Sequence, residues 1–383
     1  MPSDRQDPGE ASTAARAGTA SGFPFAFAVC QIGAERAVKA ELARLRPDYR
    51  PAFMRPGLLT WRCEPAFQPH EALAAVFVRA YGASLGVLRS ADELAARIAT
   101  LPVHGVTFPL RLHVFFRDGH RPGEAGPSDA DEDMARAAAC TAIQSAVPAG
   151  LLRQGPAEKS GEWVLDVILP PLCGAEDATI AAVPNTEPWL IGLHRHGPDH
   201  SPHAGGRPSL RLPADAPSRA WLKLEEGLRW SGLPLREREV AVEIGSAPGG
   251  ASHALLARGL TVVGVDPGSM DPRVLANGRF THLQTTLGDL RREQLPRRVN
   301  WLLLDVNLAP QVALHGLRRI VSTLRPSLRG ALLTLKLNDW SLAEQVPRFV
   351  AQVQAMGFDH VRATQLANNR QEICIAAQRR PRQ

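Results

Sequence analysis

The fold class of this chain is decided by the stretch Val240-Ala241-Val242-Glu243-Ile244-Gly245-Ser246-Ala247-Pro248-Gly249-Gly250. Its first half is an apolar run of strand length, and its second half is a loop of small residues. A helix-like segment follows, and a second apolar run over residues 261–265 ends at Asp266. This order predicts a β-α-β nucleotide-binding unit whose glycines let the backbone approach a ligand closely.

The small-residue loop also narrows the choice of ligand. It lacks the Gly-x-x-x-x-Gly-Lys-Ser/Thr of an ATP cradle and the complete Gly-x-Gly-x-x-Gly of a dinucleotide site. Asp266, after the second strand, is placed to accept hydrogen bonds from a ribose. The form Ile-Gly-Ser-Ala-Pro-Gly-Gly is similar to the loop of S-adenosylmethionine-dependent methyltransferases, and this resemblance implies that cofactor.

Length, charge and cysteine content bound the class of protein. The 383 residues are enough for two or three domains, and the 44% hydrophobic content predicts a sizeable core. The net charge of +6 favours an anionic partner, of which nucleic acid is the commonest. The five cysteines form no Cys-x-x-Cys pair, which favours a reducing, cytoplasmic compartment. No apolar run approaches the roughly 20 residues that span a bilayer, so we expect no membrane association.

The N-terminal half predicts two small α+β domains after a flexible tail at residues 1–22. The first domain spans residues 23–90, and the second spans residues 91–205. The expected strands are residues 25–30, 58–62, 108–116, 163–169 and 189–194, and the expected helices are residues 33–46, 71–81 and 131–147.

Residues 206–383 alternate strands and helices, which predicts a doubly wound, mostly parallel seven-stranded sheet of Rossmann type. The last two strands are joined by a short polar loop and should form a hairpin. The expected strands are residues 240–244, 261–265, 281–285, 301–305, 331–336, 360–364 and 373–377, and the expected helices include residues 218–230, 251–258, 310–324 and 341–356.

Four histidines gather near the end of the second domain: His194, His196, His200 and His203. One interpretation of this cluster is a metal site. The alternative is a polar segment with glycine and proline that links two domains. No cysteine or spaced acid pair accompanies the histidines, so we predict no metal.

Candidate functional residues converge at one edge of the C-terminal sheet. Ligands of open α/β sheets bind beyond the carboxyl ends of the strands, where the glycine loop, Asp266, Asp305 and Lys336 are expected. A lysine that closes an apolar strand is unusual because burying an ammonium costs free energy. The alternatives are that Lys336 extends its charge to the surface and that Asp305 caps the next helix.

Lys223 and Glu372 indicate no function when each is considered alone. Lys223 reads as a solvated lysine paired with Glu226 on the same helix, and Glu372 as an ordinary acid of the terminal hairpin. Taken together, Lys223, Asp305, Lys336 and Glu372 resemble the ordered Lys-Asp-Lys-Glu set of FtsJ-like ribose 2′-O-methyltransferases.

The C-terminal half resembles the RlmM family, bacterial methyltransferases that modify a cytidine ribose 2′-hydroxyl in large-subunit (23S) ribosomal RNA. The resemblance covers most of residues 211–377. It lies in the segments Leu212–Glu226, Glu243–Gly250, Val265–Met270, Leu335–Leu337 and Asn369–Cys374. The N-terminal half is similar more loosely, in element order and in Phe115-Phe116, which implies a ferredoxin-like domain followed by an RNA-binding THUMP domain.

The resemblance also implies residue roles. Lys336 matches the general base, and Lys223, Asp305 and Glu372 complete the tetrad. The positions that match S-adenosylmethionine contacts are Ser218, Gly245, Ala247, Pro248, Gly249, Gly250, Asp266 and Asp305. The family has an acid near the end of the third strand, where this chain offers Thr286, with Asp289 three residues later. Val306-Asn307 after Asp305 departs from the family as well.

The implied chemistry is an in-line displacement at a sulfonium methyl, in which positioning supplies much of the acceleration. The ribose hydroxyl must lose a proton, and a neutral lysine amine can take it. A free lysine titrates at about pH 10.4, so its amine is almost entirely protonated at neutral pH, and Lys336 needs help to act as a base. The Lys223 cation, the sulfonium and desolvation favour the neutral amine of Lys336, whereas Asp305 and Glu372 oppose it.

Three functions are alternatives to a ribose 2′-O-methyltransferase that acts on large-subunit RNA. The first is a 2′-O-methyltransferase of another RNA, and the second is a base methyltransferase, for which neither an Asn/Asp-Pro-Pro-Tyr motif nor a nucleophilic cysteine is evident. The third is a non-catalytic RNA-binding factor with a vestigial Rossmann domain, which predicts loss of a tetrad member. We expect a monomer that acts on naked ribosomal RNA or on an assembly precursor of the ribosome.

Overall fold

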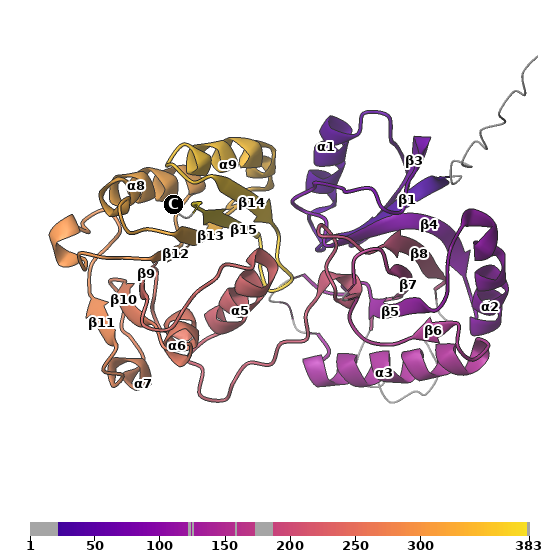
Figure 1. The fold of residues 1–383 in the computed structure, drawn as a ribbon, viewed down its shortest axis with the longest axis horizontal. Helices are drawn as coiled ribbons and strands as arrows, with labels where there is room; N and C mark the ends of the chain where they lie inside the picture. Colours follow the sequence, from indigo (N-terminus) through magenta and orange to yellow (C-terminus); the bar gives the residue numbers. More distant parts are fainter. Residues whose placement is uncertain (1–21, 122–123, 125, 158, 173–186, 381–383) are drawn as a thin grey trace, which may run out of the picture.

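A computed structural model describes residues 22–121, 124, 126–157, 159–172 and 187–380. The expected tail, apart from Gly22, and Cys173 lie outside the described residues. The chain forms two halves side by side, each built around one β-sheet (Figure 1). In the part of the chain that is described, no helix is both long enough and apolar enough to cross a membrane.

The N-terminal half contains an eight-stranded sheet with the order β2-β3-β1-β4-β8-β7-β5-β6. Strand β4 pairs with both β1 and β8, so strands from both proposed N-terminal domains share one sheet. The division at residue 90 therefore stays a prediction. The strands are β1 (Phe23–Val29), β2 (Arg50–Arg55), β3 (Leu58–Phe67), β4 (Ala80–Leu88), β5 (Leu110–Phe116), β6 (Leu152–Arg153), β7 (Trp163–Leu169) and β8 (Trp189–Arg195).

Helices of this half are α1 (Glu35–Leu45), α2 (Ala91–Thr100) and α3 (Asp129–Ala146), with short 3₁₀ turns η1 (Leu101–His104) and η2 (Ala204–Gly206). Helix α3 begins at a capping box, in which Ser128 and Asp131 satisfy each other's backbone amides. The acids of its first turn lie where the helix dipole favours negative charge, as the sequence predicts.

One expected helix, residues 71–81, is wrong. The chain forms no helix or strand between β3, which ends at Phe67, and β4, which begins at Ala80. Phe77 and Val78 are nevertheless buried, so their apolar spacing reflects packing and not helical periodicity. The amides of Val76 and Phe77 donate to the carboxylate of Glu41 on α1, at 2.9 and 3.2 Å, instead of to carbonyls one turn earlier.

The C-terminal half is the expected doubly wound sheet, with the order β11-β10-β9-β12-β13-β15-β14. Strand β15 runs antiparallel to both neighbours, and the other pairs are parallel, which confirms the terminal hairpin. The strands are β9 (Val240–Ile244), β10 (Thr261–Val265), β11 (Phe280–Leu283), β12 (Trp301–Asp305), β13 (Gly330–Lys336), β14 (His360–Thr364) and β15 (Glu372–Gln378).

Helices cover both faces of this sheet (Figure 1). Because side chains alternate along a strand, Val242 and Ile244 of β9 pack in the same core as α8 and α9, whereas Ala241 packs in the core with α5 and α6. The helices are α5 (Ala220–Ser231), α6 (Gly250–Ala257), α7 (Pro272–Leu275), α8 (Pro310–Leu324) and α9 (Val346–Gln354), with 3₁₀ turns η3 (Arg292–Gln294) and η4 (Trp340–Gln345).

The expected helix at residues 341–356 is divided into η4 and α9. Pro347 lies at the start of α9, where its missing amide leaves no hydrogen bond unmade. The proline would remove such a bond inside a longer helix, so the division follows from its position.

The two halves meet at the loop between β14 and β15. The amide of Gln365 donates to the carbonyl of Val76 at 2.7 Å. Nearby, Phe77 meets Trp340 of η4 edge to face, with ring centroids 6.1 Å apart. The irregular segment that replaces the expected helix at residues 71–81 is therefore the part of the N-terminal half that contacts this loop.

Candidate active site

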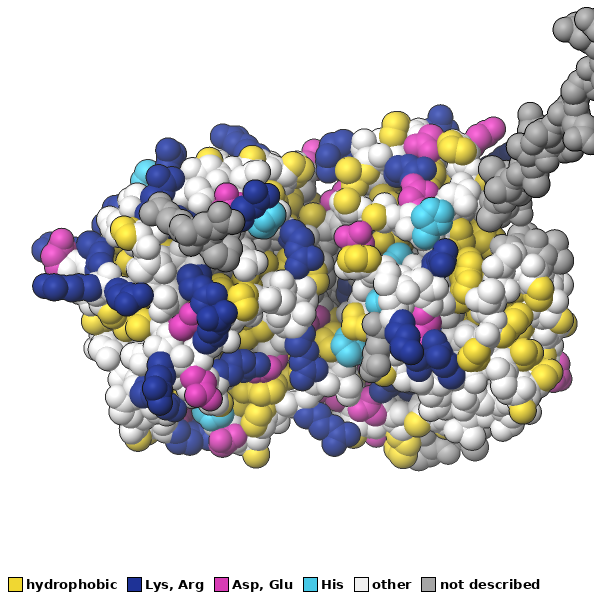
Figure 2. Space-filling view, in the orientation of Figure 1, with side chains coloured by type: hydrophobic (Ala, Val, Ile, Leu, Met, Phe, Trp, Pro, Cys, Tyr) yellow, Lys and Arg dark blue, Asp and Glu magenta, His cyan; other side chains and the backbone are white. Residues whose placement is uncertain are grey.

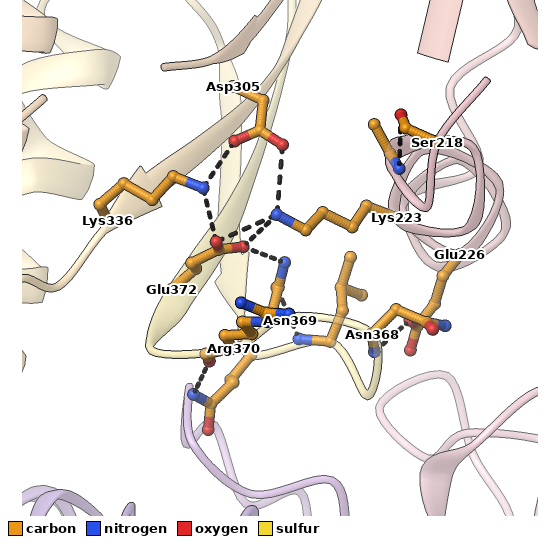
Figure 3. Close-up of polar contacts among 12 residues, drawn as sticks. Ser218, Lys223, Glu226, Asp305, Lys336, Asn368, Asn369, Arg370 and Glu372 are labelled. Carbon is orange, nitrogen blue, oxygen red and sulfur yellow. Dashed lines mark hydrogen bonds and ion pairs between the residues drawn. The ribbon is translucent and has the colours of Figure 1, made fainter. Parts of the chain in front are cut away.

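The structure brings together the four charged residues that the sequence predicts as a tetrad (Figure 3). Lys223 lies on α5, Asp305 ends β12, Lys336 ends β13 and Glu372 begins β15. Strands β12 and β13 are parallel, so their carboxyl ends share one edge of the sheet. Strand β15 is antiparallel to β13, so its first residue lies at that same edge.

Each carboxylate contacts both lysines. The Nζ of Lys336 lies 2.9 Å from Asp305 Oδ1 and 2.5 Å from Glu372 Oε1. The Nζ of Lys223 lies 3.3 Å from Asp305 Oδ2 and 2.7 Å from Glu372 Oε2. Charge-assisted contacts of this kind are stronger than neutral hydrogen bonds, so the two ammonium groups are held in fixed positions.

The tetrad is partly desolvated and its charges balance. The side chain of Glu372 is 5% exposed, and those of the two lysines are 19% exposed. Burial disfavours the ammonium of Lys336, but Asp305 and Glu372 outweigh burial and raise its pKa above the ordinary value. Burial likewise disfavours the carboxylate of Glu372, but the two lysines lower its pKa. In the ligand-free protein Lys336 therefore carries its proton.

The helix that supplies Lys223 also anchors the loop that supplies Glu372. Glu226, one turn further along α5, accepts hydrogen bonds from the amides of Ala367 and Asn368, at 2.7 and 2.8 Å, and from the Asn368 side chain. Glu226 is buried, so the interpretation of it as a surface partner of Lys223 is wrong. The sequence shows only that Glu226 follows Lys223 by three residues. The fold shows that Glu226 binds the loop between β14 and β15.

The tetrad opens into a cleft between the two halves, with a volume of about 490 Å³. Its lining includes Ser218, Lys223, Lys336 and Glu372 from the C-terminal half and basic residues from both halves, namely Arg117, Arg121, Arg207, Arg219 and Arg370. Figure 2 shows Lys and Arg side chains on both sides of the groove between the halves. The catalytic candidates thus face a basic cleft and not a closed pocket.

The glycine loop lies beside the tetrad, and two of its glycines leave no room for a Cβ atom. A Cβ at Gly245 would come 2.1 Å from the carbonyl oxygen of Asp305, and one at Gly250 would come 2.3 Å from Ser218 Oγ. Gly245 and Gly249 have φ values of 87° and 118°, which L side chains rarely adopt. This close backbone packing fits the cradle of a nucleotide-like cofactor.

Asp266 contacts the same loop from the end of β10. Its carboxylate accepts hydrogen bonds from the amide of Ala247 at 3.1 Å and from that of Gly268 at 2.7 Å. The remaining lone pairs of this half-buried carboxylate are suited to a ribose diol. Ala247 and Pro248 belong to this loop, and Ser218 lies against its last glycine.

Thr286, the proposed cofactor contact after β11, is exposed and bonded to its neighbour. Its hydroxyl lies 2.7 Å from Asp289 Oδ2 and accepts the Asp289 amide at 3.3 Å. The two residues thus form a local turn after β11. The role of Thr286 therefore stays a prediction.

Glu243, on β9 directly before the loop, is a buried acid to which the sequence assigned no role. Its carboxyl accepts a hydrogen bond of 2.5 Å from Ser252 of α6. Burial, with smaller contributions from Asp305 and Asp266, raises the pKa of Glu243 to about 8, against the opposing Ser252 bond. It is therefore protonated at neutral pH. The signal in the sequence was an acid inside an apolar strand.

Of the four histidines in the N-terminal half, His194, His196 and His200 lie against one another. His194 is buried on β8, with Nδ1 2.7 Å from Asp166 of β7, and its ring stacks on His200. Among the described residues, no group of three or more histidines, cysteines or acids is arranged to hold a metal ion. Desolvation lowers the pKa of His196 to about 4.

The C-terminal half of the chain is similar to known methyltransferases. Residues 216–355 match the family described as FtsJ-like methyltransferase. A ribosomal RNA large subunit methyltransferase M from Halorhodospira halophila is 37% identical over 180 residues, covering 45% of this chain and 50% of that protein. The protein of the same name from Methylococcus capsulatus is 36% identical over 186 residues, covering 46% of this chain and 51% of that protein. The chain thus spans about half the length of these relatives.

Solved structures align more weakly. A 1,6-didemethyltoxoflavin-N1-methyltransferase from Burkholderia thailandensis has a TM-score of 0.32 and 17% identity, covering 43% of this chain and 79% of that chain. The strand order and the tetrad, together with the family match, define the C-terminal half as an FtsJ-like methyltransferase domain. Within that class, the relatives reported above carry the name ribosomal RNA large subunit methyltransferase M.

Proposed function

We propose that this protein transfers a methyl group from S-adenosylmethionine to a ribose 2′-hydroxyl of RNA, specifically of a cytidine in 23S ribosomal RNA. The observation that carries the proposal is the closed Lys223-Asp305-Lys336-Glu372 network at the edge of the sheet beside the glycine loop. The relatives named for large-subunit ribosomal RNA support the choice of substrate.

Bound S-adenosylmethionine would supply an electrophilic methyl on a positively charged sulfur. Gly245, Ala247, Pro248, Gly249 and Gly250 would hold it, with Ser218, Asp266, Thr286 and Asp305 around them. In the reaction the oxygen–methyl bond forms, the sulfur–methyl bond breaks and the hydroxyl proton passes to the Lys336 amine. Lys223 would keep the positive potential that favours the developing alkoxide.

Lys336 must lose its own proton before it can accept another. The carboxylates of Asp305 and Glu372 keep it charged in the ligand-free protein. A nearby positive charge opposes an ammonium, and so does further desolvation. Both conditions are met when a cationic cofactor and an RNA strand fill the cleft, so deprotonation of Lys336 is coupled to assembly of the complex.

The basic cleft supports RNA as the substrate class. Arg219 and Arg370 line it, are exposed, and have no side-chain hydrogen bond or ion pair among the described residues. Free guanidinium groups beside the tetrad are suited to phosphate contacts. The N-terminal half, as a proposed ferredoxin-like and THUMP-like pair of domains, would extend this contact. We further propose that the protein acts as a cytoplasmic monomer.

The deciding experiment is a map of 2′-O-methylation across host ribosomal RNA in cells with and without the gene. Loss of one site in 23S RNA supports the proposal, and purified protein should restore methylation on that RNA with labelled S-adenosylmethionine. An unchanged map would exclude ribosomal RNA as the target. Binding of S-adenosylmethionine, measured by calorimetry, separates an enzyme acting on another RNA from a non-catalytic RNA-binding factor.

A further inference from the structure

Asn369 lies behind the tetrad, in the loop between β14 and β15. The residue is 1% exposed. The Oδ1 atom accepts a hydrogen bond from the amide of Leu366 at 3.0 Å, and Nδ2 donates to Glu372 Oε2 at 3.3 Å. A backbone N–H can only donate, so the Leu366 amide fixes which end of the Asn369 amide is oxygen. The donor end is thereby aimed at Glu372, as Figure 3 shows.

Glu372 depends on this contact because its two oxygens are unequally held. Oε1 lies 2.5 Å from Lys336 Nζ and 3.0 Å from Lys223 Nζ. Oε2 meets Lys223 at 2.7 Å and, beyond that, only the Asn369 amide among the described residues. Without Asn369 only Lys223 would hold Oε2, and the carboxylate could rotate away from its bridging position.

We propose that Asn369 is a positioning residue that acts through Glu372, holding the carboxylate where it bridges the two lysine ammonium groups without adding a charge. This inference rests on the proposed function, in which the tetrad performs methyl transfer. The neutrality of the amide is essential. A carboxylate at the same place would put a third negative charge beside two lysines that already face Asp305 and Glu372.

A purely structural role makes a different prediction. If Asn369 serves only to accept the Leu366 amide, Asn369→Asp leaves the position of Glu372 unchanged, because a carboxylate oxygen accepts that bond equally well. If Asn369 serves Glu372, the same substitution replaces a donor by an acceptor 3.3 Å from a carboxylate oxygen. The isosteric change thus keeps one contact and reverses the other.

The charged groups around Glu372 are few and come from separate elements. Lys223 faces it from α5, Lys336 from β13, and Asp305 lies across the network on β12. The neighbouring Arg370 is exposed and directs no side-chain hydrogen bond or ion pair to these groups in the described part of the chain. A new negative charge at residue 369 therefore acts chiefly on the two lysines.

The sequence makes this effect directly measurable, because the chain contains only four lysines: Lys39, Lys159, Lys223 and Lys336. We would label the full chain with ¹³C-lysine and follow the ε-methylene signals by NMR as the pH rises. In Asn369→Asp the Lys336 signal should titrate at higher pH than in the wild type. The signals of Lys39 and Lys159, which lie outside the tetrad, serve as references.

The kinetic counterpart is the pH dependence of kcat. The rising limb of Asn369→Asp should move to higher pH, with about a tenfold loss in rate at neutral pH for each pH unit of displacement. The KM for S-adenosylmethionine should stay within about twofold, because Asn369 is not among the proposed cofactor contacts.

Asn368→Ala is the matched control, because it removes the neighbouring side-chain bond to Glu226 and leaves the two backbone bonds to Glu226 intact. Its lysine titrations should match those of the wild type. Asn369→Asp with wild-type titrations and a wild-type pH profile would overturn the inference. If the wild type methylates no RNA ribose, the proposed function fails, whereas the NMR titration still decides whether Asn369 acts on Glu372.

Discussion

Lys336 and Glu372 are register partners across the antiparallel pair β13–β15, and Lys336 Nζ lies 2.5 Å from Glu372 Oε1. The contact is therefore set by the hydrogen-bond register of two central strands. A residue on a strand end is held more rigidly than one on a loop, which suits a proton acceptor that must meet its substrate within hydrogen-bond reach.

Replacement of Lys336 by methionine should abolish methyl transfer. Methionine keeps most of the side-chain volume but has no amine to accept the hydroxyl proton, so the rate should fall by about 100-fold or more. Binding of S-adenosylmethionine, measured by calorimetry, should change little. Lys39→Met, which removes a lysine of α1 in the other half, should retain both properties. Near-normal turnover by Lys336→Met would refute the assignment of the base.

Glu372→Gln should shift the pH–rate profile to lower pH and should also reduce the maximal rate. Glu372 is one of the groups that raise the pKa of Lys336, so its neutralisation should let Lys336 lose its proton at lower pH. The rising limb of the pH–rate profile should therefore move to lower pH. The maximal rate should fall, because an amide has one acceptor oxygen for two ammonium groups. A limb that moves to higher pH would contradict this account.

Much of the site was predictable from the sequence, for a physical reason. Strands β9, β10 and β12 have the expected boundaries because each is a short, largely apolar run. The tetrad was predictable from the order of its motifs. The composition agrees with this prediction, because the chain has 40 arginines and only four lysines, and two of these lysines lie in the tetrad. Arginine cannot lose its proton in a protein, so lysine is the cation that such a site requires.

The contacts that support the tetrad were not predictable. Glu226 and Asn369 are ordinary polar residues in sequence, and their partners lie in a loop or in the backbone. The irregular segment before β4 likewise depends on Glu41, which is distant in sequence and replaces helical hydrogen bonds. Such contacts follow from tertiary packing, for which periodicity contains no signal.

Gly245→Ala should disrupt both stability and cofactor binding. The added Cβ would lie 2.1 Å from the carbonyl oxygen of Asp305, and the φ of 87° is unfavourable for alanine. Strain of this type costs on the order of 1–3 kcal/mol. The clash is with the backbone of a tetrad residue, so the affinity for S-adenosylmethionine should fall together with the melting temperature.

Gly278→Ala is the control for that substitution, because a Cβ there meets no atom within 4 Å and Gly278 has no positive φ. It should match the wild type in thermal unfolding and in calorimetric binding of S-adenosylmethionine. Equal behaviour of the two alanine variants would show that the loop relaxes freely and does not need its glycine.

Glu243→Gln should remove a pH-dependent cost to stability. The pKa of Glu243 rises from 4.5 to about 8 because burial disfavours its charge. The folded state therefore holds a proton that the unfolded state releases between these pH values. Its free energy of unfolding must fall as the pH rises from about 4.5 to about 8. Glutamine stays neutral throughout, so the variant should gain stability relative to the wild type across this window, by an amount on the order of a few kcal/mol.

Urea unfolding at a series of pH values, followed by tryptophan fluorescence, measures this difference. Glu237→Gln removes an exposed acid near the start of the same strand and should give a curve parallel to that of the wild type. A Glu243→Gln curve that is also parallel to the wild type would show that Glu243 is ionised when buried. In that case the acid beneath the glycine loop would be a permanent negative charge beside Asp266 and Asp305, and the cofactor edge would be more strongly anionic than the tetrad alone makes it.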